Sequence, residues 1–179
     1  MVFRKAAEKD LPAIAEIYSD IHTEEENGTV TIGWIRDVYP TAEIAALSLQ
    51  RGDLFVAEDD GMVLGTAIIN QQQVDVYENA NWQYEAAGSE VMVLHTLVIS
   101  PRAAGNGCGT AFVKFYEEYA LSHGCPYLRM DTNEKNTRAR ALYQKLGYHE
   151  IDIVPCVFNG IEGVHLVLLE KKLLPNTEL

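Results

Sequence analysis

The sequence predicts an α/β protein in which helices flank a mixed, mostly antiparallel sheet. Short apolar runs bounded by turn residues alternate with longer segments whose apolar residues recur at helical spacing. One apolar run leads through a glycine-rich turn directly into an amphipathic helix. The length of 179 residues suffices for one well-buried domain. We therefore expect a single domain at residues 1–174 and a frayed tail at residues 175–179.

The N-terminal half is predicted to hold a strand, two helices and a hairpin. Asp10 stands directly before Leu11 and Pro12, a typical helix start, and Gly52 is a typical helix end. In chain order, the predicted elements are a strand at Val2–Lys5, a helix from Asp10, a polar loop at His22–Thr31, a helix at Thr41–Arg51, and hairpin strands at Leu54–Glu58 and Met62–Asn70.

The C-terminal half alternates strands with helices. Residues 71–89 lack clear periodicity, so they form either a long loop or a strand extension with a functional role. The predicted elements that follow are a strand at Val91–Ile99, a helix at Gly107–His123, a strand at Tyr127–Asp131, a helix from Asn136, and strands at His149–Val157 and Val164–Lys171. The resulting order is β-α-α-β-β-β-α-β-α-β-β.

Composition narrows the possible functions. There are 26 acidic residues against 14 basic ones, giving a net charge of −12, and no basic face is evident for nucleic acid. A positively charged acceptor substrate would suit the negative electrostatic field of such a chain. No stretch reaches the roughly 18 apolar residues of a membrane span, and no signal peptide is apparent. The three cysteines are scattered, so we expect neither a disulfide framework nor a metal site, and a cytoplasmic location.

The stretch from Leu94 to Val113 predicts an anion site. Glycines at 105, 107 and 109 let the backbone approach a ligand, and the helix that follows aims unpaired N–H groups at it. The loop has no Lys after its last glycine, which argues against a nucleotide triphosphatase. A dinucleotide fingerprint would need its third glycine where Thr110 stands, so that spacing also fails.

This stretch resembles motif A of the GCN5-related N-acetyltransferase (GNAT) superfamily. Leu97 and Ile99 take the apolar places before Pro101, and residues 104–109 fill the six-residue loop. The Arg or Gln usual at the first loop place is Ala104, whereas Arg102 would satisfy the pattern in another register. We adopt the first register, because the apolar residues of the next helix then fall where the motif expects them. Having Ala104 in place of Arg or Gln removes a side-chain contact to the ligand but leaves the backbone amides of the loop available to it.

A second motif resembles GNAT motif B, whose core is Asn-x-x-Ala-x-x-Leu-Tyr-x-x-Leu-Gly-Phe/Tyr. Asn136, Ala139, Leu142, Tyr143, Leu146, Gly147 and Tyr148 fill every core position. In the fold that this resemblance implies, the strands at Val91–Ile99 and Tyr127–Asp131 splay apart and hold acetyl-CoA. The residues thereby implied in cofactor binding are Leu97, Val98, Ile99, Ala104, Gly105, Asn106, Gly107, Cys108, Gly109, Thr110, Asn136 and Tyr143. Asn136 is also suited to capping the helix it precedes.

The resemblance implies acetyl transfer to an amine, for which Tyr143 is the expected proton donor to the departing thiolate. A backbone N–H near Leu97 or Val98 would stabilise the oxyanion. The alkylammonium must first lose a proton, and His95 resembles a base found in arylalkylamine acetyltransferases. Glu90 is the rival base. Further candidates are His165, Glu78 and a chain of waters.

The acceptor is expected between the loop after the first helix, residues 71–89 and the last two strands. Tyr77, Trp82, Tyr84 and the acidic run Glu24–Glu26 would suit a hydrophobic amine or a cation. The leading hypothesis is an acetyl-CoA-dependent N-acetyltransferase acting on a primary amine of a small molecule. The alternatives are a protein N-terminal or lysine acetyltransferase of the same fold and a non-catalytic acyl-CoA sensor. A homodimer is compatible with each.

Overall fold

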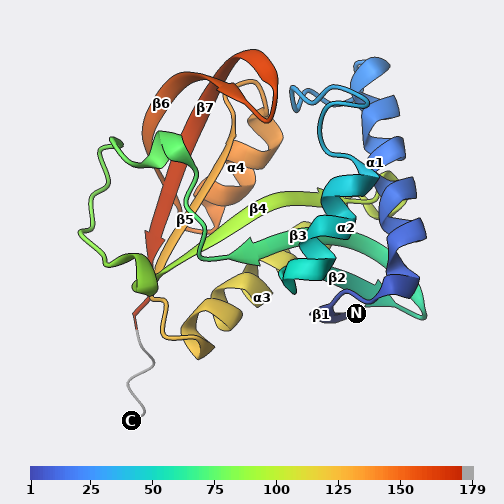
Figure 1. Cartoon of the computed structure of the whole chain (residues 1–179), viewed down its shortest axis with the longest axis horizontal. Helices are drawn as coiled ribbons and strands as arrows, with labels where there is room; N and C mark the ends of the chain where they lie inside the picture. Colours follow the sequence, from blue (N-terminus) through green and yellow to red (C-terminus); the bar gives the residue numbers. More distant parts are fainter. Residues whose placement is uncertain (175–179) are drawn as a thin grey trace.

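The computed structural model describes residues 1–174, so the tail predicted at residues 175–179 lies outside the described residues. The element order agrees with the predicted one (Figure 1). The helices are α1 (Leu11–Glu26), α2 (Ala42–Arg51), α3 (Cys108–Ser122) and α4 (Thr137–Lys145). The strands are β1 (Val2–Lys5), β2 (Leu54–Asp59), β3 (Met62–Asn70), β4 (Val91–Ile99), β5 (Tyr127–Asn133), β6 (His149–Phe158) and β7 (Ile161–Lys172).

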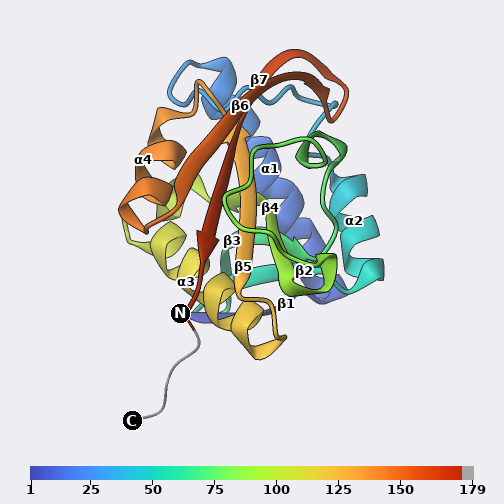
Figure 2. The same ribbon diagram turned by 90° about the vertical axis from the view of Figure 1, so that its left-hand side faces the viewer.

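The described strands form one seven-stranded sheet in the order β1-β2-β3-β4-β5-β7-β6. Its neighbours pair antiparallel except for β4 and β5, which are parallel. The predicted fold class, a mixed and mostly antiparallel sheet with one parallel pair, is therefore confirmed. In Figure 2, α3 and α4 cover one face of this sheet and α1 and α2 the other.

The parallel pair separates partway along its length. Pairing runs from Val91 opposite Tyr127 to Leu94 opposite Met130, and both strands then continue without pairing to each other. Beyond Leu94, the edge of β4 that faces β5 carries backbone groups with no strand partner. This separation is the splay that the strand pair was predicted to have.

A β-bulge in β4 coincides with the start of the splay. Thr66 lies opposite Val98, but Ile68 lies opposite His95, so β4 has one residue more than β3 between these pairs. Thr96 in the bulge has φ of +49°, which is rare for a β-branched residue. The hydroxyl groups of Tyr39 and Thr96 hydrogen-bond to each other at this point.

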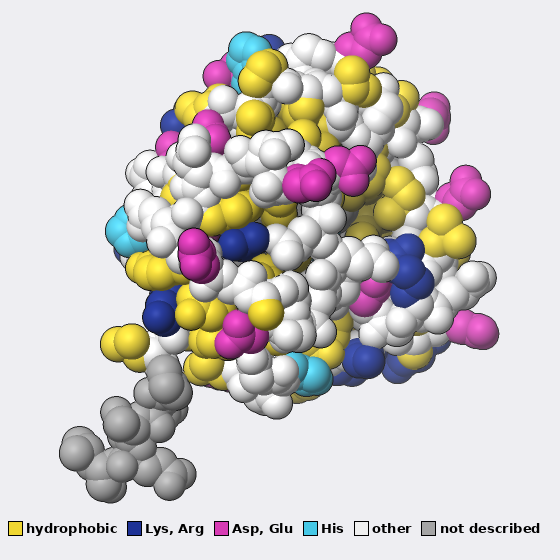
Figure 3. Space-filling model, turned by 60° about the vertical axis from the view of Figure 1, so that its left-hand side comes forward, with side chains coloured by type: hydrophobic (Ala, Val, Ile, Leu, Met, Phe, Trp, Pro, Cys, Tyr) yellow, Lys and Arg dark blue, Asp and Glu magenta, His cyan; other side chains and the backbone are white. Residues whose placement is uncertain are grey.

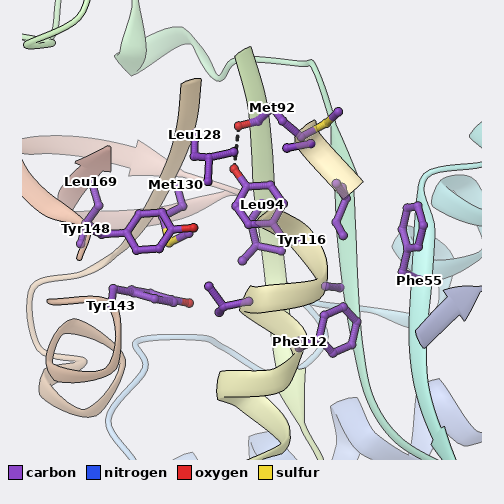
Figure 4. Close-up of a cluster of buried hydrophobic side chains, with 14 of the residues drawn as sticks. Phe55, Met92, Leu94, Phe112, Tyr116, Leu128, Met130, Tyr143, Tyr148 and Leu169 are labelled. Atoms are coloured by element: carbon purple, nitrogen blue, oxygen red, sulfur yellow. Dashed lines mark hydrogen bonds between the residues drawn. The ribbon is translucent and has the colours of Figure 1, made fainter. Parts of the chain in front are cut away.

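The core beneath the splay joins α3 to both strands. Phe112 and Tyr116 of α3 are fully buried and pack with Leu94 and Met130 (Figure 4). The Tyr116 hydroxyl donates to the Met92 carbonyl of β4 at 2.6 Å. The same hydroxyl lies 3.2 Å from the Arg129 carbonyl of β5. One side chain therefore ties the two strands together just before they part.

The prediction of a loop from His22 was wrong, because α1 continues to Glu26. The acidic run that favoured a loop is used in tertiary contacts. The Glu25 carboxylate accepts from the amides of Ile32 at 2.6 Å and Gly33 at 3.0 Å. These bonds hold the segment after α1 against the helix end, which local sequence pattern does not reveal.

Residues 71–89 form a long loop with short 3-10 turns at Asp75–Tyr77 and Gly88–Glu90 rather than a strand extension. The loop is anchored on buried charges of the sheet. The Arg129 guanidinium lies 4.1 Å from the centre of the Trp82 ring, and the buried Glu170 carboxylate accepts from the Gln83 amide. Other element ends differ slightly from prediction: β5 extends to Asn133, β6 to Phe158, and β7 begins at Ile161.

The sequence holds no predicted membrane span, and within residues 1–174 the structure has no helix long and apolar enough to cross a membrane.

We expect Tyr116→Phe to lower the free energy of unfolding by about 1–3 kcal/mol, because carbonyl groups of β4 and β5 lose their buried donor. Urea denaturation measures this loss. Tyr119→Phe is the matched control, since Tyr119 lies on the same helix, is half-buried and packs by ring contacts. Equal stability of the two variants would show that the Tyr116 hydroxyl does not hold the strands.

Candidate functional site

The glycine loop and the start of α3 form a backbone cradle. Gly105 and Gly107 have φ of +82° and +76°, which glycine adopts without strain. A Cβ added at either glycine would project into open space. The first backbone hydrogen bond of α3 runs from the Ala111 N–H to the Gly107 carbonyl at 3.0 Å. The amides of residues 108–110 precede it and are therefore available to an anion.

A groove of about 790 Å³ runs beside this cradle. Its walls come from the glycine loop, the end of β4, the start of α4 and residues 29–32. Residues predicted to bind the cofactor that do line it are Leu97, Ile99, Ala104, Gly105, Gly107, Cys108, Gly109, Thr110, Asn136 and Tyr143. Two predicted residues are not brought to it: Val98 is buried in the core against α1, and Asn106 is not part of the wall.

The position of Arg102 bears on which residue opens the motif. Its guanidinium pairs with the carboxylates of Glu16 and Asp20 on α1 and does not line the groove. Ala104 lines the groove instead. At this point the groove wall consists of backbone and a methyl group.

Two basic residues that the sequence analysis did not single out also line the groove. Lys135 and Arg138 flank Asn136, and within residues 1–174 neither forms a salt bridge. Their side chains place positive charge beside the cradle. The signal was present in the sequence, because both residues adjoin or lie within the second motif.

A smaller cavity of about 140 Å³ lies on the other side of the splay. Trp34, Tyr39 and Phe158 provide aromatic wall, and Asn159 and Thr132 provide polar groups. Residues 71–89 contribute Val74 to it, and the last two strands also line it, whereas the predicted loop at His22–Thr31 does not; the stretch after that loop contributes through Ile32, Gly33 and Trp34. The cavity and the groove share five wall residues: Ile32, Leu97, Asn136, Ala139 and Tyr143.

Tyr143 stands where the two spaces meet. It projects from α4 toward α3 and β4 (Figure 4), is 7 % exposed, and has no hydrogen-bond partner for its hydroxyl among the described residues. Burial raises the pKa of Tyr143 above its ordinary value, and the negative charge of Asp131 adds to the rise. The hydroxyl therefore stays protonated at neutral pH and can donate a proton.

Asn136 caps α4. Its side-chain oxygen accepts from the Ala139 amide at 3.2 Å, as expected for a helix N-cap. Asn136 also lies in the wall that the groove and the cavity share, so it would contact a ligand that extends from one space into the other.

His95 lines the smaller cavity, but its ring is hydrogen-bonded to the last residue of β3. Nε2 lies 3.0 Å from Oδ1 of Asn70, whose amide donates to Asp53 at 2.9 Å. Burial lowers the pKa of the His95 imidazole to about 4. The ring is therefore neutral at physiological pH and binds a proton weakly.

The other candidate bases are not brought to either space. Glu90 lies exposed at the opposite end of β4, where its carboxylate accepts from the Ala87 amide at 3.2 Å. Glu78 is exposed next to a 3-10 turn. His165 pairs with Glu134, with 2.7 Å between Nδ1 and Oε1. The splay separates the two strands only at their C-terminal ends, which leaves Glu90 remote from the site.

Asp131 is a site residue that sequence reasoning missed. It lies at the splayed end of β5 and lines the smaller cavity. The Tyr77 hydroxyl donates to its Oδ2 at 2.6 Å. Burial raises the pKa of the Asp131 carboxyl to about 6, even though this hydrogen bond favours the charged form. The sequence did contain a signal for it: Asp131 is the acidic residue at the end of a predicted strand that borders the predicted splay.

The aromatic and acidic groups expected at the acceptor site serve other contacts. Tyr77 reaches the site only through its hydroxyl, while Trp82 packs on Arg129 and Tyr84 near Tyr127. In the acidic run, Glu24 lines the groove, Glu25 binds backbone amides, and Glu26 pairs with Arg36. Across residues 1–174, no group of three or more His, Cys, Asp or Glu side chains is arranged to hold a metal.

A parallel strand pair that splays beside a glycine loop is the arrangement that the resemblance to the GNAT superfamily implied. The family model described as the acetyltransferase (GNAT) family matches residues 11–148, and the chain belongs to this family. It is an acyltransferase enzyme.

Relatives and a solved structure agree with this assignment. An uncharacterized N-acetyltransferase of Methanocaldococcus jannaschii is 26% identical over 96% of this chain and 92% of its own length. The peptidyl-lysine N-acetyltransferase YiaC of Escherichia coli is 25% identical over 84% of this chain and 85% of its own. The structure of YncA from Salmonella typhimurium with its cofactor acetyl-CoA matches with a TM-score of 0.70 and 18% identity, covering 100% of this chain and 97% of that one.

We expect the His95 imidazole to titrate with a midpoint near 4, because protonation would place a charge in a desolvated pocket wall. Heteronuclear NMR of the imidazole carbons against pH measures it, with His95→Gln identifying the signal. The unfolded state takes up this proton at higher pH, so His95 lowers stability as pH falls from about 6.5 to 4. A midpoint at or above 6.5 would show that the ring is solvated or paired with an anion.

Proposed function

We propose that this chain transfers the acetyl group of acetyl-CoA to the primary amine of a small molecule. The observation that carries this proposal is the small cavity that shares Tyr143 and Leu97 with the groove. A cavity of about 150 Å³ holds a molecule the size of benzene. A cavity of about 140 Å³ therefore suits a short alkyl or aryl amine.

The groove has the features that a pyrophosphate-bearing thioester requires. Glycine amides and the start of α3 favour the pyrophosphate, and Lys135 and Arg138 add positive charge. The unpaired edge of β4 beyond Leu94 can hydrogen-bond an extended pantetheine arm like an added strand. The structural neighbour YncA was solved with acetyl-CoA, which supports the same ligand here.

The residues at the junction supply the chemistry. A backbone N–H freed at the bulge near Leu97 can stabilise the oxyanion. Tyr143 can give its proton to the departing thiolate, because burial keeps the hydroxyl protonated. His95 is the base that the sequence predicts, but its pKa of about 4 makes the ring a weak proton acceptor, so the proposal does not depend on it.

The surface charge supports a cationic acceptor. Acidic side chains are spread over the face in Figure 3, and the chain carries a net charge of −12. Such a field raises the local concentration of alkylammonium ions.

The likeness to YiaC favours a second candidate, acetylation of a peptide lysine. A thiol-release assay with acetyl-CoA separates the two candidates. Benzylamine, phenethylamine and putrescine represent small amines, and a lysine-containing peptide with a blocked N-terminus represents protein acceptors. We expect turnover with small amines and little with the peptide. Turnover with the peptide alone would establish the second candidate, and CoA binding without any turnover would establish a sensor.

We expect Tyr143→Phe to lower kcat by about 100-fold or more, which is typical for loss of a general acid. Steady-state thiol release measures kcat, and calorimetric titration with CoA should show an unchanged Kd. Tyr148→Phe is the matched control, because Tyr148 is an adjacent buried tyrosine outside both spaces. Full activity in Tyr143→Phe would remove Tyr143 as the proton donor.

A further inference from the structure

The carboxylate of Asp131 faces the acceptor cavity without a cation. Its Oδ2 accepts from the Tyr77 hydroxyl, and Oδ1 has no hydrogen-bond partner among residues 1–174. No salt bridge in this part of the chain includes Asp131. Burying a carboxylate without a positively charged partner costs free energy. The position of Asp131 in a cavity wall therefore points to a positively charged ligand.

Five titratable groups lie near Asp131 or share the cavity wall with it, and none is a cation, while the β7 residues of this wall are apolar. They are Tyr77 from the 71–89 loop, Tyr39 from the segment before α2, His95 from β4, Tyr143 from α4 and Cys156 from β6.

The nearest strand neighbour that carries positive charge points elsewhere. Arg129 precedes Asp131 by two residues on β5 and thus lies on the same face of the sheet. Its guanidinium donates to the Gln73 side chain and stacks on the Trp82 ring at 4.1 Å. Arg129 therefore serves the loop, and the cavity side of Asp131 is left to the ligand.

We propose that Asp131 binds the ammonium group of the acceptor and takes up its proton before the amine attacks. This assignment rests on the acetyl transfer proposed above and specifies its substrate class. The acceptor is a primary ammonium ion on a short apolar or aromatic body, since Trp34, Tyr39 and Phe158 line the same cavity.

In the proposed reaction, the ammonium gives one proton to the Asp131 carboxylate, and the free amine forms a C–N bond to the acetyl carbon. The C–S bond then breaks, and its electron pair leaves with sulfur. Tyr143 protonates this thiolate and regains a proton from the nitrogen. Asp131 releases its proton to solvent, so the net products are the amide, CoA and one proton.

Asp131 is better suited to this role than His95. Burial raises the pKa of the Asp131 carboxyl to about 6 and lowers the pKa of the His95 imidazole to about 4, so Asp131 is the better proton acceptor of the two. Geometry agrees with this order, because the Nε2 atom of His95 is committed to Asn70. The Tyr77 hydrogen bond keeps the Asp131 carboxylate in place.

Asp131→Asn tests the proposal in the steady state with the best amine of the panel. We expect kcat/KM at pH 7 to fall at least 100-fold, and the rise of kcat/KM with pH near 6 in the wild type to disappear. Asp75→Asn is the matched control, since it removes one exposed carboxylate from the loop that carries Tyr77. An unchanged pH profile in Asp131→Asn, with turnover retained, overturns the proposal and leaves the proposed function intact.

A binding measurement tests the same point without turnover. Protein saturated with CoA is titrated with phenethylammonium and with its uncharged analogue 2-phenylethanol. We expect Asp131→Asn to weaken binding of the cation at least tenfold and to leave binding of the alcohol unchanged. Equal affinity of both proteins for the cation overturns the proposal, whether or not any amine is acetylated.

Thermal unfolding establishes that the variant is folded and gives a third outcome. The Asp131 carboxyl binds its proton more tightly in the folded protein than in the unfolded one. Its contribution to the stability of the fold is therefore lost as pH rises from about 4 to 6. We therefore expect Asp131→Asn to raise Tm at pH 8 relative to wild type more than at pH 4. A variant less stable at pH 8 than at pH 4, relative to wild type, would assign Asp131 a structural role instead.

Discussion

The break in pairing between β4 and β5 is the constraint on which the rest of the molecule depends. Tyr116 ties the strands together at Met92 and Arg129, pairing ends after Leu94, and the bulge at Thr96 follows directly. If the ladder continued to Ile99, backbone bonds would fill the space that now separates the strands. The groove and the smaller cavity both open at this break. Core packing beneath the break therefore sets the geometry of the site above it.

Much of the fold and of the groove could be predicted from the sequence, because the signals are local. The glycine spacing at 105, 107 and 109 sits between a strand and a helix, and Asn136 and Tyr143 share one helical motif. Each of these features is specified by residues within a turn or two of one another. The groove residues follow from that local order, with Val98 and Asn106 as exceptions.

The smaller cavity could not be predicted as well, because distant segments build it. Tyr77 and Asp131 are 54 residues apart in the chain and meet only in the fold. The value of Asp131 as a site residue depends on that meeting and on the lack of a nearby cation. The extension of α1 to Glu26 has the same origin, since Glu25 is held by amides of a later segment.

The two sides of the break differ in what they are made of, and this difference bears on how such a protein diversifies. Around Gly105 and Gly107 the groove wall is backbone, with a methyl group at Ala104. Most single substitutions leave backbone amides in place, so sequence changes seldom alter the backbone of the glycine loop. The acceptor side consists of side chains such as Trp34 and Asp131, each of which one codon change can replace. The shape and charge of this cavity can therefore change in few steps while the backbone cradle of the groove is retained.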